Sequence, residues 1–107
     1  MSNLLQDLIE AADNEPIEYV VLGAGGWEDY NLEAWGEYPK NELLTLEEVS
    51  PYLNKNYDTG YGAPDGPCLY AWTATKVIFR VQYDGSTSFY SIPRNPVAVE
   101  PEMPGGG

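Results

Sequence analysis

The sequence has no histidine and one cysteine, and these two shortages exclude several kinds of chemistry. Histidine is the commonest general base and the commonest protein ligand of transition metals, so Ser-His-Asp and Cys-His catalysis are both impossible. A single Cys68 can form neither an intrachain disulfide nor a Cys-based zinc site. An unpaired thiol suits a reducing compartment, so we expect a cytoplasmic protein. We also expect that it binds no cofactor.

Basic residues are also scarce, with 5 Lys and Arg against 17 Asp and Glu in 107 residues, a formal net charge of −12. Proteins that bind duplex nucleic acid or an anionic membrane need a basic face, which this composition cannot supply. The first residues lack the pattern of a signal peptide, and no apolar run approaches the roughly 20 residues of a transmembrane helix. We therefore expect no direct binding to nucleic acid or to a membrane.

The negative charge is concentrated in the first half of the chain. Residues 1–48 hold twelve carboxylates and one lysine, a net charge of −11, whereas residues 49–107 hold five carboxylates and four basic residues, a net charge of −1. A small domain needs a net charge of only about 2–8 in magnitude to stay soluble. The excess in residues 1–48 therefore predicts a partner-facing surface whose preferred partner is basic.

The length and the predicted elements indicate a single α+β domain. We expect a three- to four-stranded antiparallel sheet packed with two or three short helices from the N-terminal half. The domain should span residues 1–92, with an acidic half at 1–48 and a β-rich half at 49–92. The Pro- and Gly-rich residues 93–107 are predicted to be a flexible tail.

Helices are predicted at three places in the first half. Apolar residues recur at helical spacing over residues 4–13, and Ser2 or Asn3 can cap this helix. Residues 27–38 fit both a helical and a strand period, and we favour a helix because Leu, Glu and Ala prefer it. The third helix is predicted over residues 45–53, where a capping box marks the start and a proline should shorten or bend the helix.

Strands are predicted where β-branched and aromatic residues cluster, at residues 17–22, 68–73, 76–83 and 86–92. Asp84-Gly85 is the strongest short signal for a hairpin. A two-residue turn there pairs Phe79 with Tyr90, Val77 with Ile92 and Arg80 with Phe89. We expect the core face of this hairpin to carry Val77, Phe79, Val81, Tyr90 and Ile92.

Residues 54–67 form a loop with oxygen-bearing side chains and several tyrosines. Four of these side chains match ligand positions 1, 3, 5 and 12 of a calcium loop, namely Asn54, Asn56, Asp58 and Asp65. Thr59 occupies the position that needs glycine, and an aspartate replaces the bidentate glutamate. An exposed turn without a metal is therefore the favoured interpretation, with calcium as a weak alternative.

The residues predicted to contact a basic partner are acidic and aromatic. The acidic candidates are Glu28, Asp29, Glu33, Glu37, Glu42, Glu47 and Glu48. On a helix, Asp29, Glu33 and Glu37 would recur about every 6 Å. They would present a row of charge to a groove that binds a nucleic-acid backbone. The aromatic candidates, as apolar anchors, are Trp27, Tyr30, Trp35, Tyr57 and Tyr61. The alternative role of the tyrosines of the 54–67 loop is to cover the small core.

The profile as a whole is short, acidic, aromatic-rich and free of histidine. It resembles small phage-encoded inhibitors of host defence that imitate DNA, such as anti-CRISPR and antirestriction proteins, and equally the immunity proteins that cap basic nucleases. No shared motif carries this resemblance, so no residue roles follow from it. We expect a non-catalytic inhibitor of a basic nucleic-acid-acting protein. The alternative is a structural or accessory module that docks through loops bearing tyrosine and tryptophan.

Overall fold

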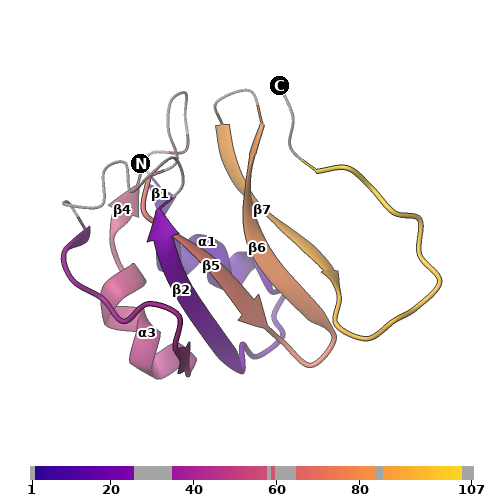
Figure 1. Cartoon of the computed structure of the whole chain (residues 1–107), viewed down its shortest axis with the longest axis horizontal. Helices are drawn as coiled ribbons and strands as arrows, with labels where there is room; N and C mark the ends of the chain where they lie inside the picture. Colours follow the sequence, from indigo (N-terminus) through magenta and orange to yellow (C-terminus); the bar gives the residue numbers. More distant parts are fainter. Residues whose placement is uncertain (1, 26–34, 58, 60–64, 84–85, 105–107) are drawn as a thin grey trace.

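A computed structural model of the chain describes residues 2–25, 35–57, 59, 65–83 and 86–104. The helices in these ranges are α1 (Leu4–Ala11) and α3 (Leu46–Leu53). The strands are β1 (Ser2–Asn3), β2 (Tyr19–Gly25), β3 (Leu43–Leu44), β4 (Asn56–Tyr57), β5 (Pro67–Trp72), β6 (Lys76–Tyr83) and β7 (Ser86–Pro93). They form a five-stranded sheet in the order β3-β2-β5-β6-β7 and a two-stranded sheet of β1 and β4, with antiparallel pairing throughout (Figure 1). The predicted α+β class is confirmed.

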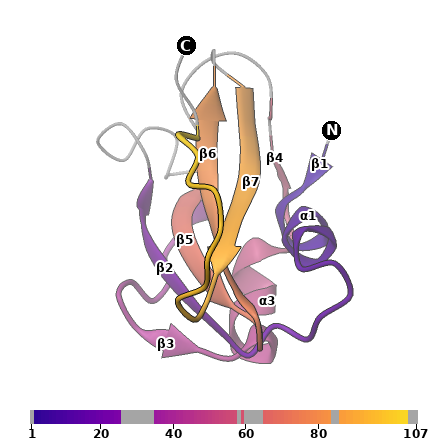
Figure 2. The ribbon, with the colours of Figure 1, turned by 90° about the vertical axis from the view of Figure 1, so that its right-hand side faces the viewer.

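Both helices lie on the same side of the five-stranded sheet, which we call its inner face (Figure 2). Each helix buries two leucine or valine side chains completely: Leu4 and Leu8 from α1, and Val49 and Leu53 from α3. The strands meet them with Val20, Leu22, Leu69, Ala71 and Ile78. Burial of these apolar side chains is the main favourable term in the folding of the domain.

Side chains at their first residues start the two helices. The Asn3 side chain accepts a hydrogen bond from the Gln6 N–H at 3.0 Å and caps α1. At α3 the predicted capping box is present: the Thr45 hydroxyl accepts from the Glu48 N–H, and the Glu48 carboxylate accepts from the Thr45 N–H. These bonds satisfy donors that the first turn of a helix leaves unpaired.

The predicted hairpin is confirmed in its register, and its second strand extends one residue beyond the prediction, to Pro93. β6 and β7 pair over their full lengths, and the partners include Val77 with Ile92, Phe79 with Tyr90 and Arg80 with Phe89. The short edge strand β3 was not predicted, because two residues are too few to show a periodic pattern. The register of β6 and β7 is the one that a two-residue connection predicts.

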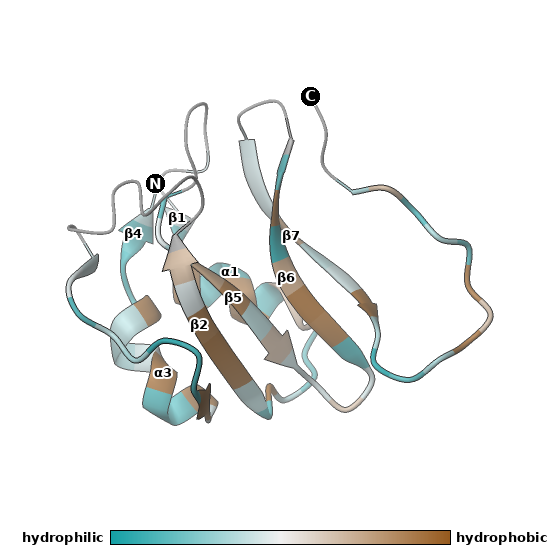
Figure 3. Ribbon diagram, in the orientation of Figure 1, coloured by the Kyte–Doolittle hydropathy of each residue, from teal (hydrophilic) through white to brown (hydrophobic). Residues whose placement is uncertain are grey.

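The predicted core face of this hairpin is wrong. Ile78 is fully buried on the inner face, and Phe89 packs against the same core. The opposite, outer face carries the residues that we expected in the core: Val77, Phe79, Val81, Tyr90 and Ile92. β6 has apolar residues at both alternating sets of positions, so its sequence does not distinguish the two faces. Figure 3 shows hydrophobic residues running along β6 and β2.

Two irregular segments, residues 36–40 and 94–104, lie in the ranges of a predicted helix and of the predicted tail. Most of the predicted helix over 27–38 lies outside the described residues. Residues 36–40 belong to neither helix nor strand, and Gly36 has a φ of +69°, so the helix prediction is wrong for its last residues. After β7, the C-terminal segment 94–104 is irregular and turns back beside the sheet (Figures 1 and 2).

Thr45→Ala is expected to lower the free energy of unfolding by about 1 kcal/mol, because it removes the hydroxyl of the capping box. Thr45→Ser keeps that hydroxyl and serves as the matched control. Urea denaturation of the three proteins measures the difference. An equal loss of stability in both variants would show that the cap contributes nothing to the start of α3.

Candidate partner-binding surfaces

The acidic candidates that the structure describes are all exposed. Glu37, Glu42, Glu47 and Glu48 lie between the loop that precedes β3 and the first turn of α3, and we call them the acidic segment. Glu28, Asp29 and Glu33 lie outside the described residues. The structure therefore places part of the predicted acidic surface along one edge of the sheet, where β3 is the terminal strand.

Hydrogen bonds favour the charged form of two carboxylates. The backbone N–H and the hydroxyl of Thr45 both donate to Glu48 and lower the pKa of that carboxyl. The Thr75 hydroxyl donates to Glu15 at 2.7 Å and lowers the pKa of Glu15, with nearby Lys76 adding to the effect. Both groups are thus anionic well below neutral pH.

The basic side chains at the start of β6 and just after β7 are paired with carboxylates. Lys76 lies 3.1 Å from Asp13 and 3.8 Å from Glu15. Arg94 lies 2.5 Å from Glu18 and also donates to a backbone carbonyl. These pairs join residues 13–18, before β2, to the open end of the β6–β7 hairpin, and they neutralise carboxylates outside the acidic segment.

Two of the other three cations are held by the fold itself. Lys55 donates to the carbonyl of Trp35 at 3.0 Å, and Arg80 donates to two backbone carbonyls. Lys40 is exposed and lies over the Tyr38 ring, 4.9 Å from its centroid. Among the described carboxylates, those of Glu37, Glu42 and Glu47 have no basic nitrogen within 4.0 Å. Lys40 lies between Glu37 and Glu42 in the sequence, so residues 37–48, with four carboxylates, keep a net charge of −3.

The aromatic candidates that the structure describes are not on the surface. Trp35 is 4% exposed and Tyr57 is 2% exposed, and both belong to the hydrophobic core. Trp27, Tyr30 and Tyr61 lie outside the described residues. The prediction that the rings of Trp35 and Tyr57 anchor a partner is wrong, because both are core residues. For Tyr57, a tyrosine of the 54–67 loop, this is the alternative role of covering the core.

Specific contacts hold Trp35 in the core. Its indole N–H donates to the Asp65 carboxylate at 3.0 Å, and Lys55 lies over its ring at 5.5 Å from the centroid. Gly66, with a φ of +90°, lies directly against the ring. A Cβ atom at this glycine would lie 2.8 Å from a ring carbon of Trp35. The glycine is thus required both by its backbone conformation and by close packing.

Tyr57 and Arg80 form a partly buried polar chain beside it. The Tyr57 hydroxyl donates to Asp7 at 2.7 Å, and the Arg80 guanidinium lies 5.5 Å from the centre of the Tyr57 ring. Arg80 also donates to the carbonyls of Asp65 and Pro67, each at 2.7 Å, while its buried Nε has no partner among the described atoms. This chain connects α1, β4 and β6 to the end of the 54–67 loop.

Burial shifts the pKa values of Tyr57 and Arg80. Burial of the Tyr57 hydroxyl, and then its bond to Asp7, raise the pKa of Tyr57 above the ordinary 10.0. Burial lowers the pKa of Arg80, but a guanidinium stays charged at any physiological pH. Tyr57 is therefore a neutral donor and Arg80 a cation, and neither is free to act on a substrate.

The described members of the weak calcium candidate have other partners. The Asn54 side chain accepts from the Asn3 amide at 3.0 Å, and the backbone of Asn56 pairs with that of Asn3 in the small sheet. Asp65 binds the Trp35 indole, while Asp58 lies outside the described residues. Within the described ranges, no three His, Cys, Asp or Glu side chains gather as they would around a metal ion.

The outer face of the five-stranded sheet is a surface that the sequence predictions missed. One row of paired residues crosses every strand, in the order Leu43, Val21, Tyr70, Phe79 and Tyr90. A second row crosses four strands, in the order Tyr19, Trp72, Val77 and Ile92. All nine side chains are apolar or aromatic. The available signal was the apolar character of both alternating sets in β2 and β6.

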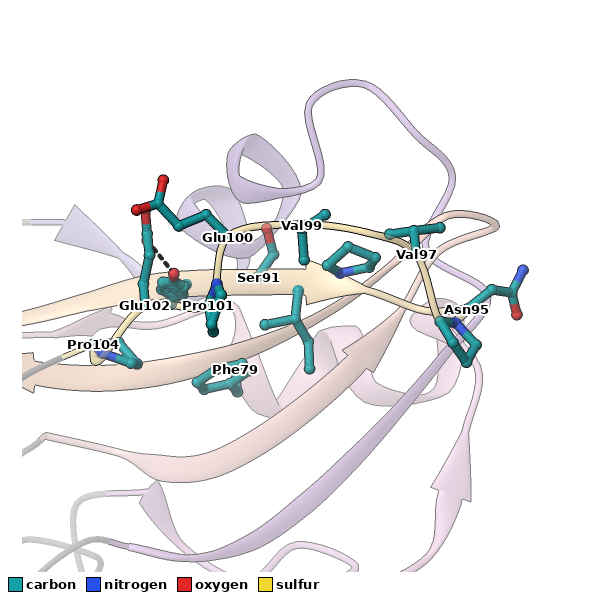
Figure 4. A pocket seen from close by; sticks show the side chains of 13 residues that line it. Phe79, Ser91, Asn95, Val97, Val99, Glu100, Pro101, Glu102 and Pro104 are labelled. Carbon is teal, nitrogen blue, oxygen red and sulfur yellow. Dashed lines mark hydrogen bonds between the residues drawn. The ribbon is translucent and has the colours of Figure 1, made fainter.

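The C-terminal segment approaches the outer face on the β6–β7 side. A groove of about 540 Å³ lies between them, and Figure 4 shows Val97, Val99 and Pro101 lining it with Phe79. Glu102 of this segment accepts a hydrogen bond from the Tyr90 hydroxyl, which raises the pKa of Tyr90. The segment therefore covers part of the outer face, while the β3-β2-β5 part has no such cover among the described residues.

Comparison of the chain with known protein families, with curated proteins and with solved structures finds no match. None of the described helices has the length and the apolar character needed to cross a membrane. The two candidate surfaces, the acidic segment and the outer face, therefore have to be interpreted from the residues of this chain.

Gly66→Ala is expected to lower the free energy of unfolding by about 3 kcal/mol, because a methyl group there adds a clash with Trp35 to the cost of a positive φ. Gly36→Ala is the matched control: its φ is +69°, and an added Cβ meets nothing within 4 Å. It should cost about 1 kcal/mol. Equal losses, measured by urea denaturation, would mean that the contact with Trp35 is unimportant.

The raised pKa of Tyr57 predicts a loss of stability in alkali. The contribution is complete below pH 10, the ordinary pKa, and it falls as pH rises, since the unfolded chain releases the proton while the folded protein retains it. The slope from this group is about 1.4 kcal/mol per pH unit. Tyr57→Phe lacks this slope, so its stability deficit relative to wild type should shrink between about pH 9 and about pH 11. A constant deficit in urea denaturation contradicts the assignment.

Proposed function

We propose that this protein is a non-catalytic inhibitor that binds a basic nucleic-acid-acting protein through its acidic segment. Such a partner presents lysine and arginine to the phosphates of DNA or RNA. Carboxylates placed on the same basic surface would compete for it, in the manner of a DNA mimic. An anti-restriction, anti-CRISPR or nuclease-immunity role has this chemistry in common.

The observation that supports the proposal most strongly is the way the chain uses its cations. Lys55, Lys76, Arg80 and Arg94 are engaged with carbonyls or with carboxylates outside the acidic segment, and Lys40 is the one cation between Glu37 and Glu48 in the sequence. Glu37, Glu42 and Glu47 remain exposed without a basic partner in the described structure. Uncompensated charge on one edge attracts a basic surface and speeds its encounter with the protein.

Catalysis is not part of the proposal, because the polar side chains with the most specific geometry are used in holding the fold. Asp7 binds Tyr57, Arg80 binds backbone carbonyls, and the Asp65 carboxylate binds the Trp35 indole. A cytoplasmic location accompanies the proposal, since the single Cys68 is exposed and unpaired, and a free surface thiol is best tolerated in a reducing compartment.

A structural or accessory interaction module is the second candidate function. Its loop-based form is weakened by the burial of Tyr57. The exposed apolar rows on the outer face favour it instead, because contiguous exposed apolar surface on a small domain commonly marks a protein interface.

Charge reversal in the acidic segment tests the proposed function. Glu37→Lys and Glu42→Lys are compared with Glu10→Lys, an exposed position on α1; each raises the net charge by 2, from −12 to −10. Proteins of the source cell that bind heparin are separated, and their binding to labelled duplex DNA is followed by fluorescence anisotropy. We expect wild type and Glu10→Lys to displace DNA from a basic protein, and the two segment variants to be about fivefold weaker at low salt.

Salt provides the second readout of the same experiment. The difference between the segment variants and the control should narrow between about 50 mM and about 300 mM salt, because screening weakens interactions between exposed charges. If the protein displaces DNA from none of the heparin-binding fractions, or if all three variants match wild type at every salt concentration, the proposed function is wrong.

A further inference from the structure

The outer face is unusually apolar for a surface that neither of the described helices, α1 and α3, covers. Leu43 is 61% exposed, Tyr70 58% and Ile92 50%. These residues belong to the two cross-strand rows and are therefore neighbours across the sheet rather than scattered single residues. Contiguous exposed apolar surface of this kind is a common mark of a binding site.

Acidic side chains border the outer face at both edges of the sheet. Glu42 directly precedes Leu43 on the β3 edge, and Glu100 and Glu102 line the groove beside β7. None of the nine row positions is basic. A complementary partner surface therefore has an apolar centre and basic residues around it.

The same border argues against a second copy of this chain as the occupant. Two outer faces in contact would bring acidic borders of like sign together, in molecules that each have a net charge of −12. Like charges placed opposite each other at an interface oppose association. A basic partner gains attraction where a second copy meets repulsion.

We propose that the outer face is the surface on which the basic partner is held, through an apolar patch of that partner surrounded by lysine and arginine. This inference rests on the proposed function and adds to it a second role for a second surface. The acidic segment attracts the partner, and the outer face retains it, because charges speed association whereas desolvated apolar anchors slow dissociation.

Cys68 provides a natural probe of this face. It is the only cysteine of the chain and is exposed. It lies two residues before Tyr70 on β5, so it points to the same side of the sheet. It also lines a hollow of about 360 Å³ on this side together with Val21, Tyr70 and Phe79. A partner seated on the β3-β2-β5 part of the outer face must cover this thiol.

The first arm of the test shortens exposed side chains. Leu43→Ser and Tyr70→Ser remove apolar contacts from the outer face, and Ile9→Ser removes an exposed apolar side chain from α1. Dissociation from the DNA-binding protein identified by displacement is measured by surface plasmon resonance. We expect Leu43→Ser and Tyr70→Ser to dissociate about tenfold faster than wild type, whereas the salt dependence of their association rates should be unchanged. Ile9→Ser should match wild type in both rates. Circular dichroism confirms that each variant is folded.

The second arm measures the rate at which iodoacetamide alkylates Cys68. We expect the rate to fall about tenfold when the partner is bound, and to be unaffected by raising the concentration of the protein alone. Wild-type displacement of DNA with an unprotected Cys68 and unchanged dissociation of the serine variants would overturn this inference and leave the proposed function standing. Concentration-dependent protection with a doubled mass in sedimentation would identify a second copy as the occupant and overturn it too. Absence of any DNA displacement refutes the proposed function itself.

Discussion

The row of small and β-branched side chains on the inner face is the constraint on which the rest of the domain depends. Val20, Ala71 and Ile78 are paired across β2, β5 and β6, and all three are fully buried. These side chains project only a short distance from the sheet, so the two eight-residue helices can pack closely against it. Helices this short cover one face only, so the apolar residues at the alternate positions remain on the other side.

A set of polar contacts outside the helix–sheet packing fixes Trp35 and the start of β5. Arg80 holds the carbonyls of Asp65 and Pro67, and the Asp65 side chain holds the indole of Trp35. Arg80 is thus used within the fold, where its guanidinium binds backbone carbonyls. The same arrangement makes the rings of Trp35 and Tyr57 part of the core.

Features that depend on neighbouring residues could be predicted from the sequence, and features that depend on tertiary packing could not. The Thr45 capping box and the register around Asp84-Gly85 are local, and both were predicted correctly. The side of β6 that faces the helices was not, because Val77 and Ile78 are equally apolar, and only the helices distinguish them. The exposure of the acidic segment follows from its composition, whereas the burial of Trp35 depends on contacts made by distant residues.

The acidic border of the outer face has a consequence for the protein when it is alone. An apolar sheet face next to open strand edges is a template for association with other copies, and natural sheets guard such surfaces with charge. Glu42, Glu100 and Glu102 occupy that guarding position. Their like charges make separate copies repel one another, whereas the apolar rows alone would favour association. Colloidal stability and the proposed recognition of a partner thus draw on the same charges, so a change that improves one alters the other.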